Sequence, residues 1–156
     1  MRDSESDVRL ISGGESLVIE PQDGQAVIAR AEKIFKEIDA DFRKWELDRH
    51  GKRTDTILVD VYELVSDAVF LDMFSCISLE WDKLVMTQSQ VIWFCRKYPK
   101  WIRRIHPTLF LMDEFDDYYI ASIRYYRPDL HAGVFHFSYD YNWKSKYPPR
   151  IVVPHR

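Results

Sequence analysis

The chain has 156 residues, of which 46% are hydrophobic, 30% charged and 15% aromatic, and its formal net charge is −3. This length fits one domain with a core of its own, and the composition excludes fibrous, collagen-like and low-complexity proteins. Two cysteines are too few for a disulfide scaffold. The sequence shows neither an apolar signal segment nor a stretch of roughly 20 apolar residues. We therefore expect a cytoplasmic protein without a membrane span.

Charged and aromatic residues are unevenly distributed along the chain. Residues 1–86 carry 11 Lys/Arg and 19 Asp/Glu, a net charge of −8, whereas residues 87–156 carry 11 and 6, a net charge of +5. Of the 23 aromatic residues, 16 lie between Trp93 and Tyr147. The charge pattern predicts either attraction between the two halves or a basic face for an anionic partner.

The N-terminal half is predicted to have a disordered tail over residues 1–15 and a short extended segment over 16–21, followed by helices, with a single domain over 16–156. Apolar residues recur every three or four positions over 24–49, which predicts an amphipathic helix. Short helices are expected within 60–85. Thr87 and Gln90 form a capping-box pattern, which predicts the start of a helix over 88–104 that either kinks or breaks at Pro99.

The C-terminal half is predicted to form strands, because its hydrophobic period changes from 3.6 to 2. The strands are expected at about 108–112, 118–126, 134–143 and 148–153. Helices followed by strands are typical of an α+β domain, so we predict N-terminal helices packed on an antiparallel sheet of three or four strands.

The stretch "VFHFSYDYNWK", residues 134–144, has an aromatic residue at every second position. These residues are Phe135, Phe137, Tyr139, Tyr141 and Trp143. Burial of the rings beneath the helices is favoured, because a half-buried strand presents one face to the core. Two alternatives stay open: an exposed platform that stacks nucleic-acid bases, or buried inner rings with Tyr141 and Trp143 emerging as a patch for a protein partner.

Five basic residues between 96 and 104 have a spacing close to one face of a helix. They are Arg96, Lys97, Lys100, Arg103 and Arg104. Such a face fits a phosphate-binding surface, but exposed basic residues on helices are more often simply solvated.

No established catalytic or ligand-binding motif is present. The HExxH and CxxC metal patterns, the glycine-rich phosphate loops and the GxSxG elbow are all absent from the sequence. We therefore predict no catalytic residue, no metal and no cofactor. Cys95 lies on the apolar stripe of its predicted helix and is expected to be an inert, buried thiol.

The function that these observations favour is a non-enzymatic module that binds a protein partner or associates with itself. Its expected anchors are Trp101, Tyr141 and Trp143, with Arg103 and Arg104 as a charged rim and Lys144 beside them. The first alternative is binding of single-stranded nucleic acid by the same surface. The second is an enzyme whose site forms only in the fold, around His136, Asp140 and Tyr119.

Overall fold

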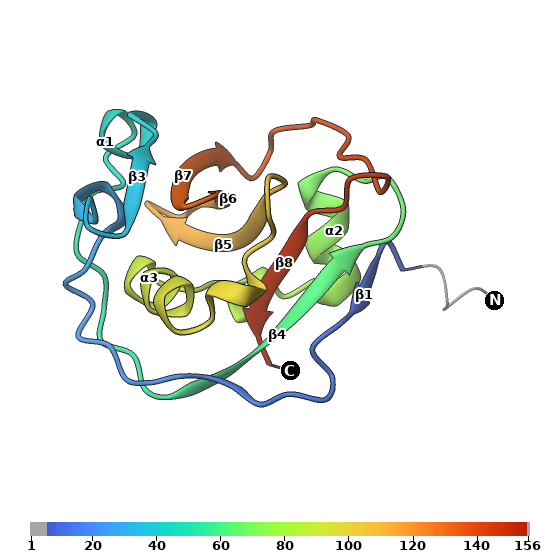
Figure 1. Ribbon diagram of the computed structural model, residues 1–156, viewed down its shortest axis with the longest axis horizontal. Coiled ribbons are helices and arrows are strands. Elements are labelled where there is room, and N and C mark those ends of the chain that lie inside the picture. Colours follow the sequence, from blue (N-terminus) through green and yellow to red (C-terminus); the bar gives the residue numbers. More distant parts are fainter. Residues whose placement is uncertain (1–5, 156) are drawn as a thin grey trace.

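A mixed eight-stranded sheet organises residues 6–155, the part of the chain that the computed structural model describes (Figure 1). The strands, in their order across the sheet, are β1 (Val8–Leu10), β4 (Ile57–Leu64), β8 (Arg150–Pro154), β5 (Thr108–Glu114), β6 (Asp117–Tyr126), β7 (Asp129–His136) and β3 (Phe35–Ile38), with β2 (Leu17–Ile19) also paired to β4. The β8–β5 and β3–β7 pairs are parallel, and the other pairs are antiparallel.

The predicted fold class, N-terminal helices packed on a C-terminal sheet of three or four strands, is wrong. Residues 24–49 form no long helix: they contain the short 3-10 helix η1 (Ile28–Arg30), strand β3 and the single-turn helix α1 (Asp41–Lys44). The chain buries Phe35 and Leu47, which are not among the apolar residues that recur every three or four positions in the predicted helix. Pairing of β3 with β7 and packing into the core thus override the local helical pattern.

The N-terminal half contributes four strands to the sheet, whereas the sequence predicts helices, a tail and one short extended segment over 16–21, which contains β2. Strand β4 covers the first part of the region 60–85, in which short helices are predicted, and it pairs with β8 from the C-terminal end. Residues 1–5 of the predicted tail lie outside the described residues, and β1 lies within the remainder. The two halves are therefore joined within a single sheet.

The main helices are α2 (Phe70–Ile77) and α3 (Gln88–Lys97), accompanied by the 3-10 turns η2 (Trp81–Lys83) and η3 (Pro99–Trp101). Helix α3 starts with the predicted capping box: the Thr87 hydroxyl accepts from the Gln90 backbone N–H, and the Gln90 side chain accepts from the Thr87 N–H. It ends at Lys97, not at 104, because Pro99 cannot donate the next backbone hydrogen bond. Arg103 and Arg104 therefore lie beyond the helix.

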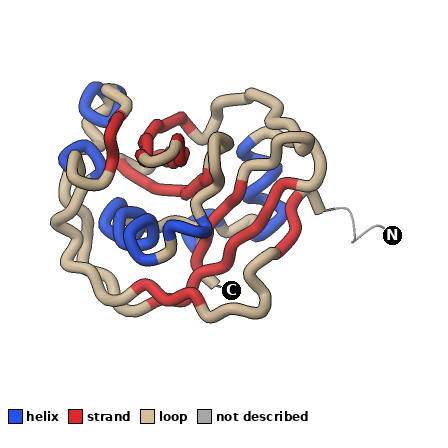
Figure 2. The backbone as a smooth tube through the Cα atoms, viewed as in Figure 1, coloured by secondary structure: helices blue, strands red, loops and turns tan. Residues whose placement is uncertain are grey.

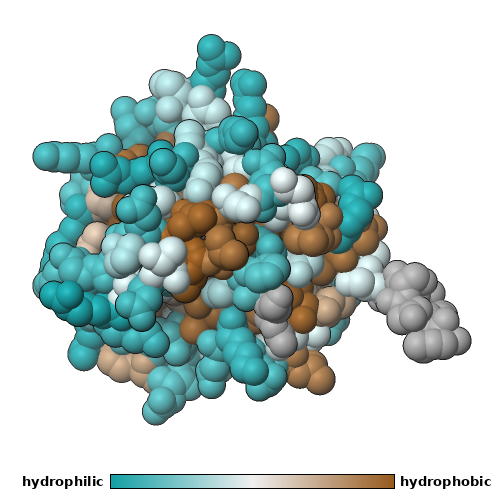
Figure 3. All heavy atoms as spheres, turned by 90° about the horizontal axis from the view of Figure 1, so that it is seen from below, coloured by the Kyte–Doolittle hydropathy of each residue, from teal (hydrophilic) through white to brown (hydrophobic). Residues whose placement is uncertain are grey.

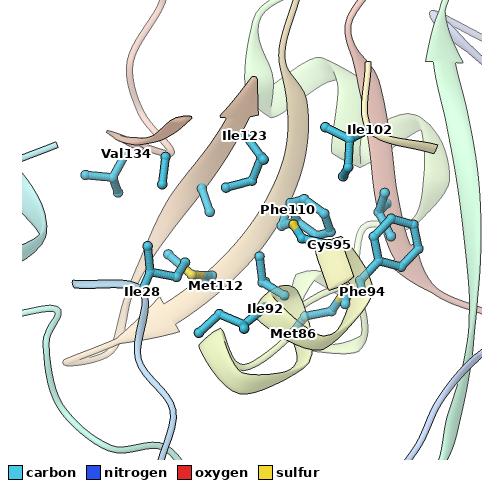
Figure 4. Packing of buried hydrophobic residues seen from close by; sticks show 14 of the residues in the cluster. Ile28, Met86, Ile92, Phe94, Cys95, Ile102, Phe110, Met112, Ile123 and Val134 are labelled. Carbon is cyan, nitrogen blue, oxygen red and sulfur yellow. The ribbon is translucent and has the colours of Figure 1, made fainter. Parts of the chain in front are cut away.

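Helices α3 and α2 cover opposite faces of the sheet, and each face has its own core. The α3 core contains Phe94 and Phe110, which lie close together in Figure 4 (ring centroids 5.6 Å apart). The α2 core contains Phe74 and Leu111. Because successive strand residues point to opposite faces, β5 supplies both cores, and this explains its uninterrupted apolar run.

Burial of Cys95 in the α3 core raises the pKa of its thiol, so that the thiol stays neutral at mildly alkaline pH. Cys76 is exposed. We expect a thiol reagent at about pH 8 to modify one cysteine per native chain and two per unfolded chain. A second thiol that reacted rapidly in the native protein would contradict the burial of Cys95.

Exposed hydrophobic side chains are scattered over the surface. Seen from below, the molecule is mainly hydrophilic, with hydrophobic residues gathered near the middle of that face (Figure 3). Leu10, Leu58 and Leu79 are among the exposed large hydrophobic residues. Because exposed apolar residues are common on folded proteins, exposure alone identifies no site; contacts among the exposed groups are also needed.

Candidate functional site

The connection between β7 and β8, residues 137–149, carries most of the aromatic stretch. Strand β7 ends at His136, whereas the sequence predicts a strand over 134–143. His136 pairs with Tyr119 of β6, and the Phe137 N–H still donates to the Tyr118 carbonyl (3.1 Å) before the two segments part. The connection leaves the sheet and runs along the top of the molecule to β8 as a long loop (Figures 1 and 2). Backbone hydrogen bonds between Ala68 and Trp143 attach it near α2.

Because the connection leaves the sheet, the five aromatic side chains differ in their exposure to solvent. Phe137 is only 6% exposed and packs against Phe74 and Trp81, with ring centroids 5.8 and 5.1 Å away. Tyr139 and Tyr141 are 45% and 46% exposed. Phe135 and Trp143 are half-buried. The structure is closest to the alternative in which the inner rings are buried and two outer rings form a surface patch. The exposed pair is Tyr139 and Tyr141, however, and not Tyr141 and Trp143.

The exposed tyrosines belong to a group of four contacting rings, which we call the aromatic patch: Phe135, Tyr139, Tyr141 and Trp143. Phe135 and Tyr139 stack nearly parallel, with centroids 5.1 Å apart and planes 9° apart. Tyr139 and Tyr141 stack at 6.3 Å and 13°. Trp143 meets Tyr141 edge to face at 4.9 Å. Both arrangements are favourable for aromatic pairs.

Phe70, the first residue of α2, supports the patch from below. Its side chain is fully buried, and its ring lies 5.6 Å from Phe135, 6.4 Å from Tyr139 and 5.4 Å from Trp143. A buried ring in contact with three others restricts their rotamers. Phe70 therefore orders Tyr139 directly, whereas Tyr141 is ordered through its contacts with Tyr139 and Trp143. Such ordering lowers the entropy lost when a partner binds.

Asp67 anchors the connection next to the patch. Its carboxylate accepts hydrogen bonds from the backbone N–H (2.8 Å) and the hydroxyl (3.0 Å) of Ser145, and Lys144 Nζ lies 3.8 Å away. These hydrogen bonds, with a smaller contribution from Lys144, lower the pKa of Asp67. The anchor is therefore complete above the ordinary pKa of an aspartate and is lost as the pH falls through the lowered value.

Replacing Asp67 with alanine is expected to loosen the connection without unfolding the sheet. The Ser145 amide loses its acceptor, so hydrogen exchange at this position should accelerate by about tenfold, while amides of β5 and β6 keep their protection. Native-state hydrogen exchange followed by mass spectrometry measures both. Unchanged exchange at Ser145 would show that Asp67 does not hold the connection.

The six residues predicted to form the binding site lie in two places. Tyr141 and Trp143 belong to the aromatic patch, with Lys144 directly after them. Trp101, Arg103 and Arg104 lie in or just beyond η3. Their closest link to the connection is the hydrogen bond from Arg103 Nε to the Pro148 carbonyl, at 2.9 Å.

Sequence reasoning missed Phe70 as a site residue. It lies more than 60 residues before the tyrosines it supports, and no spacing pattern links it to them. Trp101 was predicted as an exposed anchor, but its indole N–H is buried, without a hydrogen-bond partner among the described residues. The Trp101 ring instead faces the Arg150 guanidinium, with 5.6 Å from Cζ to the ring centroid.

The residues of the predicted enzyme alternative are only partly brought together. The rings of Tyr119 and His136 lie 5.2 Å apart, and Trp45 packs on His136 at 4.1 Å. Within residues 6–155, no hydrogen bond, ion pair or ring contact joins Asp140 to either of them. The described residues also contain no group of three or more His, Cys, Asp or Glu side chains arranged to hold a metal ion.

A cavity of about 250 Å³ lies beside Tyr119 and is also lined by His50, Lys52 and Glu114. Burial raises the pKa of Glu114, and it also raises the pKa of Tyr119. In the described part of the chain, however, no hydrogen bond links a nucleophile to a base at this cavity.

Comparison with known family models, curated proteins and solved structures finds no significant match to this chain. Functional inference therefore depends on the geometry of the surface. No helix within residues 6–155 has both the length and the apolar character needed to cross a membrane.

Proposed function

We propose that this protein is a non-enzymatic interaction module that binds a protein partner through the aromatic patch. The observation that carries the proposal is the exposure of Tyr139 and Tyr141, nearly half of each side chain, in a stacked row above the buried Phe70. Rigid, amphipathic tyrosines supply a large contact area at a low entropic cost, and aromatic residues dominate the binding energy of protein interfaces.

The charges around the patch favour a protein partner over a nucleic acid. Lys144 is close to Asp67, and the exposed Asp140 lies between the two tyrosines in sequence. A phosphate backbone requires a local excess of positive charge, which these residues do not provide. A protein surface with an apolar centre and a polar rim matches this arrangement better.

Site-specific photo-crosslinking tests the proposal. A benzophenone amino acid is placed at Tyr141 in cells that naturally contain the protein, and at Phe115 as a control. Phe115 is also exposed, but it lies in the β5–β6 turn, and among the described residues its ring contacts Arg49 and no ring of the patch. We expect one discrete adduct from position 141 and none from position 115; an adduct of twice the chain mass would identify self-association. Identical adducts from both positions, or none from position 141, would refute the proposal.

The double substitution Tyr139→Ala/Tyr141→Ala is expected to weaken binding of the captured partner by about 30-fold or more, because it removes both exposed rings. The fold should persist, since each side chain is nearly half exposed. Titration calorimetry with the purified partner measures the affinity, and Phe115→Ala is the matched control. A loss of less than about threefold would place the contact elsewhere.

A further inference from the structure

Charge is segregated along the β5–β6 hairpin. Its turn carries Asp113, Glu114, Asp116 and Asp117, whereas Arg103 and Arg104 precede β5 and Arg124 lies near the end of β6. Seven strand residues at about 3.3 Å each place the two ends roughly 20 Å apart. This separation exceeds the Debye length, which is about 8–10 Å at ordinary salt concentrations. Salt therefore screens the basic end of the hairpin from the charges of the acidic turn.

Side chains from three segments meet at this end, and we call them the basic cluster: Arg103, Arg104, His106, Arg124 and Lys146. Arg124 Nη1 lies 3.5 Å from the Ile105 carbonyl and 3.4 Å from the Tyr126 hydroxyl. The His106 ring stacks on Tyr147 at 5.2 Å, and Lys146 Nζ lies 5.7 Å from the centroid of the same ring.

The cations of the basic cluster are not neutralised by carboxylates. Within residues 6–155, no Asp or Glu oxygen lies within 4 Å of a side-chain nitrogen of the four Arg and Lys residues in the cluster. Arg150, which lies nearby at the start of β8, does have such a partner in Glu63. Partial burial and then the charges of Arg103 and Arg124 lower the pKa of His106, as expected where positive potential accumulates.

Large apolar and aromatic side chains are exposed among these cations. Ile105 has a φ of 71° and is 51% exposed. A left-handed conformation is costly for a β-branched residue, and such backbone strain is concentrated at functional sites. Tyr147 is 54% exposed, and Tyr126 is also exposed. The cluster thus combines cations that form no ion pair with a carboxylate and solvent-exposed tyrosines.

We propose that the basic cluster binds single-stranded nucleic acid, with Arg104 and Arg124 contacting phosphates and Tyr147 and Tyr126 stacking with bases. Unpaired basic side chains beside exposed rings are the combination that single-strand binding uses. An acidic peptide would satisfy the cations but would leave the two rings without a matching partner. This surface is separate from the aromatic patch, so the inference does not depend on the proposed protein partner.

Fluorescence anisotropy with a short labelled oligouridine or oligothymidine tests the inference. We expect saturable binding at about 50 mM salt that weakens markedly at about 200 mM. The variant Arg104→Gln/Arg124→Gln should bind about tenfold more weakly, with a salt slope smaller by about 1.4, since each single-strand phosphate contact contributes about 0.7. Tyr147→Ala should bind about tenfold more weakly with an unchanged slope.

The control variant is Arg96→Gln/Lys97→Gln, which removes two exposed charges from α3 and should leave the affinity within about twofold. Thermal melting verifies that each variant is folded. Absence of any anisotropy change at low salt overturns the inference. The inference is also overturned if a polyglutamate peptide binds as tightly as the oligonucleotide and if Tyr147→Ala does not change the affinity for that peptide. The cluster would then recognise an acidic protein segment.

Discussion

Replacing Phe70 with alanine is expected to destabilise the fold by about 3–5 kcal/mol and to release the aromatic patch. The ring is fully buried beneath Phe135, Tyr139 and Trp143 and belongs to the α2 core. Its removal leaves a cavity below rings that have no other fully buried aromatic contact among the described residues. Urea unfolding measures the loss of stability, and hydrogen exchange over 137–149 measures the release.

Leu71→Ala is the matched control for Phe70→Ala. Leu71 is the next residue of α2, but its side chain is exposed, so we expect a change within about 0.5 kcal/mol and no effect on exchange in the connection. If Phe70→Ala cost less than about 1 kcal/mol, or if exchange over 137–149 stayed at the wild-type rate, Phe70 would not be the support of the patch.

Replacing Gly24 with alanine is expected to destabilise the protein by about 2–5 kcal/mol. Gly24 has a φ of 83°, and a Cβ atom at this position would lie 2.4 Å from the Gly51 carbonyl oxygen and 2.5 Å from that of Lys52. The left-handed conformation costs about 1–2 kcal/mol for alanine, and overpacking against backbone adds about 1–3 kcal/mol. Urea unfolding measures the sum.

Gly133→Ala provides the comparison for Gly24→Ala. Gly133 lies in β7 with an ordinary φ, and its added Cβ would come no closer than 3.7 Å to any atom, the Ser122 carbonyl oxygen. We expect this change to be neutral or to stabilise the strand by up to about 1 kcal/mol. Equal destabilisation by the two substitutions would contradict the close approach of Gly24 to residues 51 and 52.

Locally encoded features were predictable from the sequence. The capping box at Thr87 and Gln90 marks the start of α3, because its hydrogen bonds form within four residues. Strands β5 and β6 lie near their expected positions, since a tight turn joins them and their pairing is local. Pro99 gave a local signal that the helix either kinks or breaks there; the predicted bound of 104 corresponds to a kink, whereas α3 breaks.

Features that depend on distant partners were not predictable. Strand β3 forms because β7, about 95 residues later, offers it an edge, and no pattern within 24–49 records that edge. Strand β1 has three residues and exists through pairing with β4; β2 also pairs with β4 but lies in the segment 16–21 that the sequence predicts to be extended. A short segment carries too few residues for a period to be recognised, so the tertiary partner decides its conformation.

In the candidate site, too, local features were predictable and features that depend on distant residues were not. The alternation over 135–143 correctly singled out the rings but not their burial, which depends on where the chain leaves the sheet after β7. The support from Phe70 comes from another element altogether. Arg103 and Arg104 were expected beside Tyr141 on one surface, but they lie in the loop before β5, where they meet Arg124 and the end of the connection at Pro148.

Hydroxyl-radical footprinting of Tyr139 and Tyr141, in the purified protein and inside its native cells, tests the role of the aromatic patch most directly. In the purified protein at low concentration, both tyrosines should be oxidised as readily as the exposed Phe115. Inside cells a bound partner should protect the two tyrosines several-fold, while Phe115 is oxidised equally in both settings. Equal oxidation of Tyr139 and Tyr141 in both settings would contradict a partner-binding role for this surface.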